Sequence, residues 1–393
     1  MKEGWTYKKL GEVAMLKNGF AFKSSLFKET GTPIVRISNI QDDRITTDFV
    51  YFDKNDYRET LDKYEVYEGD ILIAMSGATT GKVGINTNSE VLYLNQRVGK
   101  FVPQKELHSL FLFYYLKRNA NFSLSVAQGM AQPNLSTQQI NNFIIPIPPL
   151  AEQERIVAEL DLLSSIIEKK KAQLKELDQL AQSIFYDMFG DPITNEKGWE
   201  IEKFEDVCSS MTKGPFGSDI KKSLYVPKSE DTYKVYIQIN AIEKDATLGT
   251  YYISKEYFDN KMFKFEVKPN DYIITCDGTL GKFLRLPQSI EKGIISASLL
   301  RLTLNEKINY KYFEHIWDCY ILQQQTKDIR NTALKHLPSA SKMGKTLIPL
   351  PPLPLQQEFA SKVEAIERQK SLIQQSIDEV QTMFDGRMDY WFG

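Results

Sequence analysis

The chain has 393 residues, a formal net charge of −2 and 42% hydrophobic residues, values that are ordinary for a globular protein of two or three domains. No apolar run approaches the ~18 residues of a membrane span, and the N-terminal stretch MKEGWTYKKL lacks the apolar core of a signal peptide, so a cytoplasmic protein is expected. Cys208, Cys276 and Cys319 are odd in number and far apart, which predicts free thiols.

Charge is unevenly distributed along the chain. Residues 1–150 carry a net charge of +2 and residues 193–353 carry +3, whereas residues 151–192 carry −4 and residues 354–393 carry −3. This pattern is compatible with mildly basic binding domains on acidic connectors, and equally with ordinary scatter of charge over solvated surfaces.

The first segment, residues 1–147, is predicted to be mixed α/β. The short β-rich runs TPIVRISNI and DILIAM alternate with turn signals, and Ser109–Phe122 has the pattern of a helix. We expect a curved sheet with helices on one side.

The stretch SGATTGK, Ser76–Lys82, is not a P-loop. Only three residues separate its glycines, and Val83 follows the lysine where a P-loop has Ser or Thr. The stretch recurs as DGTLGK at Asp277–Lys282. Its glycine pair indicates a tight hairpin. Such a turn either has no ligand or reaches into a DNA groove, where backbone N–H and Thr hydroxyl groups bond phosphates or base edges and the lysine neutralises a phosphate.

The chain is a tandem repeat. GWTYKKLGEV at Gly4–Val13 recurs as GWEIEKFEDV at Gly198–Val207, an offset of 194 that drifts to 203 and stays there from Pro146 onward. The second globular segment, residues 191–348, is therefore predicted to repeat the mixed α/β fold. Its runs YKVYIQINAI and DYIITC are β-rich, and Tyr310–Thr326 is its expected helix.

A long helix is predicted after each Pro-Pro pair, at residues 148–190 and 349–393. Apolar positions recur at steps of four and three, as in the seam of a coiled coil, and the seam slots of the two copies lie 29 heptads apart. We predict an antiparallel pair; the alternative is two independent amphipathic helices, each lying on its own domain. The predicted helix–helix seam consists of Ile156, Leu160, Leu163, Ile167, Leu174, Leu177, Ile184, Phe359, Val363, Ile366, Ile373, Ile377, Val380 and Phe384.

No catalytic constellation is evident. The sequences IPPL and LPPL lack the polar and aromatic flanks of an amino-methyltransferase motif, and a nuclease-like Glu266–Lys268 has no matching Asp. His315 and Cys319 lie one helical turn apart, but no further metal ligands occur at a known spacing, so no metal site is predicted.

Several of these motifs resemble those of the specificity subunit of Type I restriction–modification systems, over essentially the whole chain. The most specific is the repeated helix entry that begins IPIPPLAEQERIVAEL at Ile145–Leu160. The other matching stretches are AQSIFYDMFGDP (Ala181–Pro192), GDILIAMSGATTGKVGI (Gly69–Ile85), NGFAFKS (Asn18–Ser24) and KGPFGSD (Lys213–Asp219).

The resemblance implies an α+β protein in which two target recognition domains, residues 1–147 and 191–348, each read one half of a bipartite, asymmetric DNA site. Two long antiparallel coiled-coil helices, residues 148–190 and 349–393, would space them with internal pseudo-two-fold symmetry. Two methyltransferase subunits and motor-nuclease restriction subunits would be the protein partners. S-adenosylmethionine, ATP and Mg²⁺ would bind those partners, so this chain would be non-catalytic and would carry no cofactor.

Two further points remain open from the sequence. The second helix lacks the acidic residue that Glu152 supplies in the first, so two docking sites would differ in strength if that carboxylate helps to bind a partner. The alternatives to a specificity subunit are a coiled-coil scaffold without a DNA role and a stand-alone DNA nuclease or methyltransferase.

DNA contacts are predicted for polar and basic residues at strand ends and in glycine-bearing loops of repeat-equivalent places. In the first segment these are Arg36, Ser38, Asn39, Ser76, Gly77, Thr79, Thr80, Lys82, Gln96, Arg97, Gln132 and Asn134. In the second they are Lys213, Ser218, Gln238, Asn240, Asp277, Gly278, Thr279, Lys282, Arg301, Lys335 and His336.

Overall fold

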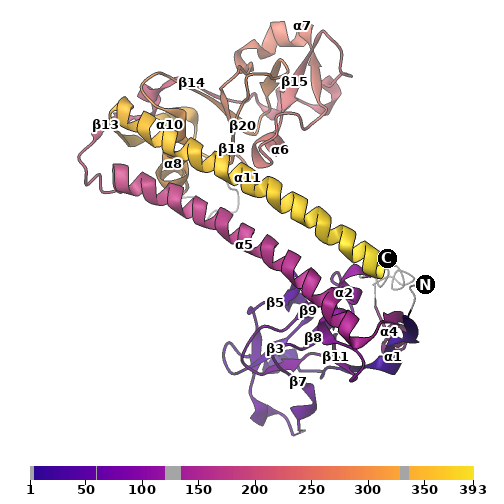
Figure 1. The fold of residues 1–393 in the computed structure, drawn as a ribbon. Helices are drawn as coiled ribbons and strands as arrows, with labels where there is room; N and C mark the ends of the chain where they lie inside the picture. The colour runs from indigo at the N-terminus through magenta and orange to yellow at the C-terminus, as the bar shows by residue number, and fades with distance from the viewer. Residues whose placement is uncertain (1–3, 59, 120–133, 328–335) are drawn as a thin grey trace. The chain divides into compact units, whose positions relative to one another are not determined.

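The chain consists of two units of contacting residues, and each long helix contributes one end to each unit (Figure 1). Unit 1 comprises Met1–Ala172 and Ile373–Gly393, and unit 2 comprises Gln173–Leu372. The long helices are α5 (Leu150–Phe189) and α11 (Leu353–Phe392), each 40 residues long. The computed structural model describes residues 4–58, 60–119, 134–327 and 336–393.

Unit 1 contains three sheets. Their strand orders are β1-β12, β6-β3-β10-β7 and β2-β11-β8-β9-β5-β4. The strands are β1 (Thr6–Lys9), β2 (Ala14–Asn18), β3 (Thr32–Val35), β4 (Ile40–Gln41), β5 (Arg44–Ile45), β6 (Val50–Phe52), β7 (Glu65–Val66), β8 (Ile71–Ala74), β9 (Val83–Ile85), β10 (Leu92–Leu94), β11 (Val98–Pro103) and β12 (Ile144–Ile147). The short helices are α1 (Leu10–Val13), α2 (Ser109–Arg118) and α4 (Thr137–Asn141).

Unit 2 repeats this plan. Its sheets have the orders β13-β21, β14-β20-β17-β18 and β16-β15-β19. The strands are β13 (Glu200–Lys203), β14 (Cys208–Lys213), β15 (Thr232–Tyr236), β16 (Tyr252–Ser254), β17 (Tyr272–Thr275), β18 (Phe283–Arg285), β19 (Gly293–Ile295), β20 (Leu299–Leu304) and β21 (Leu347–Leu350). The helices are α6 (Gln238–Ile242), α7 (Lys255–Tyr257), α8 (Tyr310–Ile316), the π-helical turn η10 (Trp317–Ile321), α9 (Leu322–Thr326) and α10 (Ala340–Gly344).

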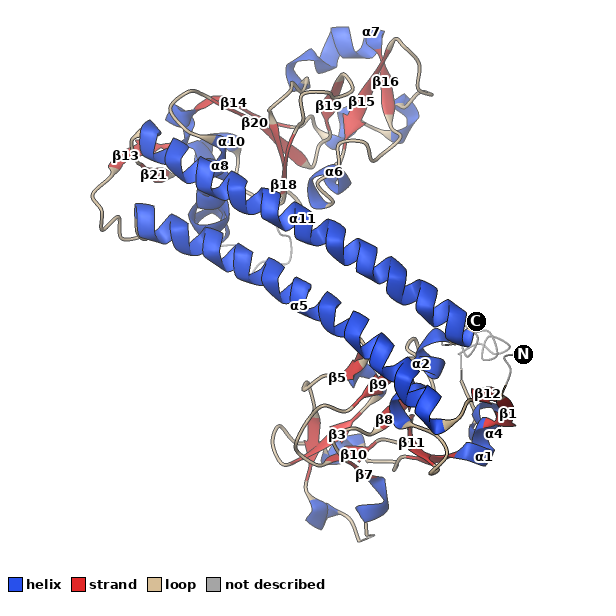
Figure 2. Ribbon diagram, in the orientation of Figure 1, coloured by secondary structure: helices blue, strands red, loops and turns tan. Residues whose placement is uncertain are grey.

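The predicted mixed α/β class with long helices is confirmed. The prediction of a single curved sheet in each segment is wrong, because each unit contains three separate sheets (Figure 2). The run TPIVRISNI stops being a strand at Val35, and YKVYIQINAI stops at Tyr236. An asparagine causes each stop, because its side chain accepts a hydrogen bond from a backbone N–H three residues earlier and closes a helical turn. Asn39 Oδ1 lies 2.9 Å from the Arg36 nitrogen, and Asn240 Oδ1 lies 2.8 Å from the Ile237 nitrogen.

Each long helix is fixed at its start by a buried glutamine. Gln153 of α5 and Gln356 of α11 are both fully buried, 203 residues apart. Gln153 Oε1 accepts from the backbone N–H of His108 at 2.8 Å, and its Nε2 donates to the carbonyls of Glu106 and Pro148, each at 2.9 Å. Its amide therefore ties the first turn of the helix to the strand-to-helix loop that precedes α2.

The far end of each helix docks on the globular part at which the other helix starts. In unit 1 the last turns of α11 lie against residues of the first globular segment: the Phe392 ring centroid is 5.2 Å from that of Phe111, and Trp391 stacks on Trp5 at 6.2 Å. In unit 2 the last turns of α5 pack in the corresponding place, with Phe189 4.8 Å from Tyr312.

Within each unit the two helix ends also contact each other and run antiparallel. In unit 1 Arg387 of α11 forms an ion pair with Glu159 of α5, and this pairing lowers the pKa of the Glu159 carboxyl. In unit 2 Phe359 of α11 packs on Phe189 of α5, with ring centroids 5.3 Å apart. The alternative of two helices that each lie only on their own domain is therefore wrong.

None of the predicted seam residues is exposed, but their burial varies along the helices. Eight of them are buried: Ile156, Leu160, Ile167, Phe359, Val363, Ile366, Ile377 and Phe384. The other six are half-buried: Leu163, Leu174, Leu177, Ile184, Ile373 and Val380. The core of unit 2 also includes Phe185 and Phe189 of α5, two positions that the predicted seam omits.

Several other expectations concern single residues. All three cysteines are free, as predicted, and burial raises the pKa of each thiol to about 12. Glu152 accepts a hydrogen bond from the Trp5 indole at 3.2 Å, so its carboxylate has a partner within unit 1. His315 packs on Phe359, and burial lowers the pKa of its imidazole.

Among the described residues, no helix is long and apolar enough to cross a membrane.

Candidate nucleic-acid interface

The hairpin loop that recurs in the sequence connects β8 to β9 in unit 1 and β17 to β18 in unit 2. Both strand pairs are antiparallel, but the loops are longer than the tight turn we predicted. In unit 1 the backbone N–H of Gly81 closes the loop on the Ala74 carbonyl at 2.8 Å; in unit 2 Gly281 closes it on Thr275 at 2.9 Å. The loop therefore projects beyond the strands as a defined structure of successive turns.

A second segment, which precedes α4 or α10, clamps each hairpin loop. In unit 1 Ser76 bridges Asn134, and the Leu135 N–H donates to the Met75 carbonyl at 2.8 Å. In unit 2 the same bridge joins Asp277 to His336, whose Nδ1 lies 2.7 Å from Asp277 Oδ1. The predicted contact residues Ser76 and Asn134, and likewise Asp277 and His336, are thus brought together.

A third segment completes the cluster. In unit 1 the Met75 N–H donates to the Arg97 carbonyl at 2.9 Å, and in unit 2 the Cys276 N–H donates to Ser298 at 2.9 Å. Gln96 and Arg97, both exposed, therefore lie beside the hairpin loop. We call each set of hairpin loop, clamp and third segment the loop cluster: residues 75–82, 95–97 and 134–135 in unit 1, and 276–282, 296–298 and 336–337 in unit 2.

The loop after β2 or β14 is held against this cluster by a glycine. A Cβ on Gly214 would lie 1.9 Å from the Ser296 carbonyl oxygen, and one on Gly19 would lie 2.1 Å from that of Asn95. Real Cβ atoms do not approach backbone oxygens so closely, so only glycine allows this contact. The two glycines occupy equivalent places in NGFAFKS and KGPFGSD.

Gly214→Ala is expected to destabilise unit 2 by about 1–3 kcal/mol or more, because backbone must move to accept the methyl group. Gly217→Ala in the same loop is the matched control, since a Cβ there meets nothing within 4 Å and its change should be nearly neutral. Urea unfolding of both variants checks the prediction; equal midpoints for the two would contradict it.

The helical segment Tyr310–Thr326 packs against the hairpin loop of unit 2 and supports it. Trp317 Nε1 donates to the Gly281 carbonyl at 2.9 Å, and the indole is fully buried. Next to it, burial raises the pKa of Asp318, and the positive charges of Lys244 and Lys282 oppose that rise. The buried Trp317 side chain therefore holds the hairpin loop in place, while the Lys282 side chain is exposed to solvent.

The predicted DNA-contacting residues fall into groups by exposure. Exposed side chains belong to Ser38, Lys82, Gln96, Arg97, Asn134, Lys213, Ser218, Thr279, Lys282 and His336, with Gly278 also exposed. Half-buried positions are Arg36, Ser76, Gly77, Thr79 and Asp277, and Thr80 is buried with its hydroxyl on the Gly77 carbonyl at 2.6 Å. Gln132 and Lys335 lie outside the described residues.

Four of the predicted contact residues are instead committed to internal partners. The buried amides of Asn39 and Asn240 donate to two backbone carbonyls each. Arg301 is half-buried and donates to Ser210 Oγ and Thr212 Oγ1 at 3.1 and 3.2 Å, and Gln238 donates to the Asp277 carbonyl at 3.0 Å. We leave these four out of the interface, because a base contact would break hydrogen bonds that hold the loops in place.

Two hydroxyl groups of the first hairpin loop are buried without a hydrogen-bond partner among the described residues: Ser76 Oγ and Thr79 Oγ1. A buried hydroxyl that makes no hydrogen bond costs free energy, about 1–3 kcal/mol each. Such groups often mark a place where a ligand or water completes the hydrogen bonding. Their position in the loop cluster supports a binding role for this loop in unit 1.

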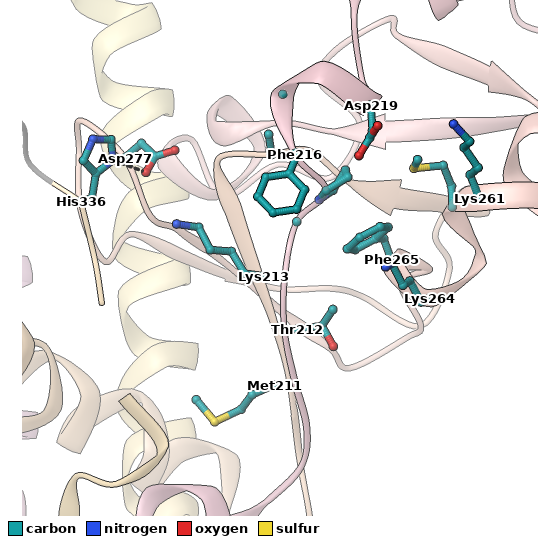
Figure 3. A pocket seen from close by; sticks show the side chains of 15 residues that line it. Met211, Thr212, Lys213, Phe216, Asp219, Lys261, Lys264, Phe265, Asp277 and His336 are labelled. Carbon is teal, nitrogen blue, oxygen red and sulfur yellow. Dashed lines mark hydrogen bonds and ion pairs between the residues drawn. The ribbon is translucent and has the colours of Figure 1, made fainter. Parts of the chain in front are cut away.

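Unit 2 has an open cleft of about 880 Å³ between the loop after β14 and the segment that carries Lys261 and Lys264 (Figure 3). Lys213 lines one side, and His336 and Asp277 lie at one end. Among the described residues, none of the three lysines forms an ion pair. The cleft is therefore a basic, open groove beside the loop cluster, which suits a polyanion better than a small apolar ligand.

Sequence reasoning missed Lys261 and Lys264, because they lie in helical turns and not at the strand ends or glycine-bearing loops from which contact residues were predicted. It also missed Gln153 and Gln356, for which a signal exists: both glutamines recur at the fixed offset of 203, although the residues on either side of them differ between the two copies. The described residues contain no group of three or more His, Cys, Asp or Glu side chains that could hold a metal ion.

The sequence matches the family model described as "Type I restriction modification DNA specificity domain" twice, over residues 2–179 and 196–382. The Type I restriction enzyme EcoBI specificity subunit of Escherichia coli is 26% identical over 407 residues, which span 93% of this chain and 79% of that protein. The EcoKI specificity subunit of E. coli K12 is 27% identical over 228 residues, covering 56% of this chain and 48% of that protein.

Two solved structures share the fold over the whole chain. One, from a study of complex assembly and conformational transition of the type I R-M system, aligns with a TM-score of 0.59 at 17% identity and covers 100% of this chain and 98% of that one. The other is the S subunit of a Type I restriction–modification system from M. genitalium, with a TM-score of 0.53 at 14% identity, covering 99% and 96%.

Proposed function

The chain belongs to the family of Type I restriction–modification DNA specificity domains, and from that premise we propose that its two units each read one half of a bipartite, asymmetric DNA site. The observation that carries the proposal is the loop cluster: both units build it from the same three segments, yet the side chains that it exposes differ. A shared scaffold with different exposed side chains suits recognition of two different half-sites.

Phosphate and base contacts would be divided among the exposed residues. Lys82 and Lys282 lie in the hairpin loops and can each neutralise a phosphate, which positions a unit without selecting a sequence. Gln96 and Arg97 present donors and acceptors that fit base edges in the major groove. The net charge of −2 keeps binding by the chain alone weak, because few phosphates are neutralised.

We further propose that the long helices set the spacing of the half-sites and that methyltransferase subunits dock on the assembled chain. A continuous helix of 40 residues is about 60 Å long at ~1.5 Å per residue. Two binding units on one stiff connection bind a double site more tightly than either alone. S-adenosylmethionine, ATP and Mg²⁺ would bind the methyltransferase and motor-nuclease partners, and this chain would supply specificity without catalysis.

The test is to map adenine methylation in DNA exposed to the chain together with its methyltransferase subunits. One bipartite motif is expected, and binding should weaken when either half is scrambled. Methylation or cleavage by the isolated chain would instead identify an enzyme. The absence of any DNA-dependent shift with the partners present would favour a scaffold.

Replacing Arg97 by Ala is expected to weaken binding by about 5- to 150-fold, the ~1–3 kcal/mol of one good bidentate base contact. The loss should be confined to the half-site that unit 1 reads, so it should vanish on a duplex with that half scrambled. Arg58→Ala, an exposed arginine outside the loop cluster, is the control. An unchanged footprint for the Arg97 variant would remove this residue from the interface.

A further inference from the structure

Phe216 is the most exposed large apolar side chain among the described residues, at 81% exposed. It lies in the KGPFGSD loop after β14 and lines the basic cleft of unit 2. Figure 3 shows its ring between Lys213 on one side and Asp219 on the other. Among the described residues, Phe216 forms no ring contact with another aromatic side chain, so its apolar surface is available to a ligand in the cleft.

The loop holds Phe216 in a defined position. The Gly214 backbone packs against Ser296, as described above, which fixes the start of the loop. After the ring, the Asp219 N–H donates to the Phe216 carbonyl at 2.8 Å, and the Tyr257 hydroxyl donates to the Asp219 carbonyl at 2.7 Å. The exposed ring therefore stands on a short turn that is tied to the body of the unit at both ends.

The electrostatic setting favours a nucleic acid over an apolar protein surface. Three lysines line the cleft, at positions 213, 261 and 264, while Asp277 is already paired with His336. This leaves Asp219 as the remaining acidic side chain of the lining, half-buried under the turn. Positive charges around a projecting aromatic ring can bind the two phosphate backbones while the ring reaches the bases.

Unit 1 has no equivalent ring. In its NGFAFKS loop Ala21 occupies the place of Phe216, and the neighbouring Phe22 turns inward, where it is buried 4.7 Å from the Phe52 ring. The glycine that fixes the loop is the same in both units, so the backbone plan is shared while the projecting side chain is not. The difference is therefore specific to the half-site that unit 2 reads.

We propose that Phe216 is a specificity-determining residue of unit 2 that inserts its ring against the base stack of the DNA, while Lys213, Lys261 and Lys264 bind the flanking phosphates. The proposal rests on the DNA recognition proposed above and adds a mode of reading to it. An inserted apolar side chain unstacks a base step and favours sequences that deform easily at that step. Unit 2 thus reads part of its half-site through deformability, and unit 1 does not.

The experiment uses the full chain assembled with its methyltransferase subunits and a duplex that carries the mapped methylation motif. Binding is measured for the wild type, Phe216→Ala, Phe216→Leu and the control Phe263→Ala; Phe263 is an equally aromatic, 62% exposed residue outside the cleft lining. We expect the Phe216→Ala complex to bind about 10- to 100-fold more weakly, as loss of a buried aromatic contact predicts. Phe216→Leu should retain much of the affinity, and Phe263→Ala should behave as the wild type.

A second readout tests insertion itself. The fluorescence of 2-aminopurine, placed at successive positions of the second half-site, should rise at one step with the wild-type complex and stay low with Phe216→Ala. Unchanged binding by Phe216→Ala, or an equal loss for Phe263→Ala, would overturn the inference while leaving DNA recognition in place. Loss of the methyltransferase subunits from the Phe216→Ala complex would identify a protein contact instead. Failure of the intact wild-type complex to bind the duplex would overturn the proposed function as well.

Discussion

Gln356→Ala is expected to destabilise unit 2 by about 2–4 kcal/mol, because it removes one side chain and leaves several buried backbone groups without partners. Gln356 Oε1 accepts from the Asn309 N–H at 2.7 Å, and its Nε2 donates to the Pro351 carbonyl at 2.7 Å. The side chain is fully buried, so water cannot replace these hydrogen bonds without opening the structure. The first turn of α11 would then detach from the loop before α8.

The measurement is urea unfolding combined with hydrogen exchange of the backbone amides. The Gln356 variant should lose protection around Asn309 before unit 2 unfolds as a whole. Gln357→Ala is the matched control, since it removes the same residue type from the next, exposed position of the same turn. A Gln356 variant as stable as the Gln357 variant would show that the buried amide does not fix the helix. Gln153→Ala should repeat the effect at the start of α5.

The two glutamines illustrate what the sequence can reveal about this fold. A residue that stays at a fixed offset while its neighbours change, as Gln153 and Gln356 do within PPLAEQERI and PPLPLQQEF, reports a shared structural requirement. The long helices were predictable for the same reason, because an apolar pattern kept in register over two copies has few other causes. The division into three small sheets was not, since strands of two to six residues carry too little alternation to show which of them pair.

The repeat pointed to the hairpin loops, the clamp segments and the loops after β2 and β14, and in each unit these segments lie together. The sequence does not distinguish an asparagine that caps a turn from one that faces solvent, because both occur just after a strand. Asn39 and Asn240 follow strands, and their side chains are used inside the protein. Phe216 escaped notice for the opposite reason: a search for matching residues passes over the position at which the two copies differ.

Phe359→Ala is expected to have the largest effect on stability, a loss of about 3–5 kcal/mol from unit 2. The Phe359 ring is fully buried where three segments meet: the end of α5, the helix α8 and the start of α11. Its centroid lies 5.6 Å from that of Phe185 and 4.9 Å from that of His315. Removing the ring leaves a cavity that these side chains cannot fill without shifting α5.

The consequence should reach beyond one contact, because the Phe359 ring packs on both Phe185 and Phe189 in the last turns of α5. Exposed ion pairs between α5 and α11, such as Lys370 with Asp178, cannot replace this packing, because each contributes only about 0–1 kcal/mol. We therefore expect Phe359→Ala to expose the chain between Phe189 and Trp199 to proteolysis under native conditions.

Leu372→Ala is the control, since this apolar residue of the same helix is 66% exposed and its loss should change stability by less than about 0.5 kcal/mol. Thermal unfolding and limited proteolysis of the two variants decide the matter. If both melt together and resist the protease equally, the helix ends are held by contacts other than the Phe359 ring. If only Phe359→Ala becomes labile, the antiparallel pairing of α5 and α11 depends on this aromatic cluster, and any spacing of two half-sites by the helices depends on it as well.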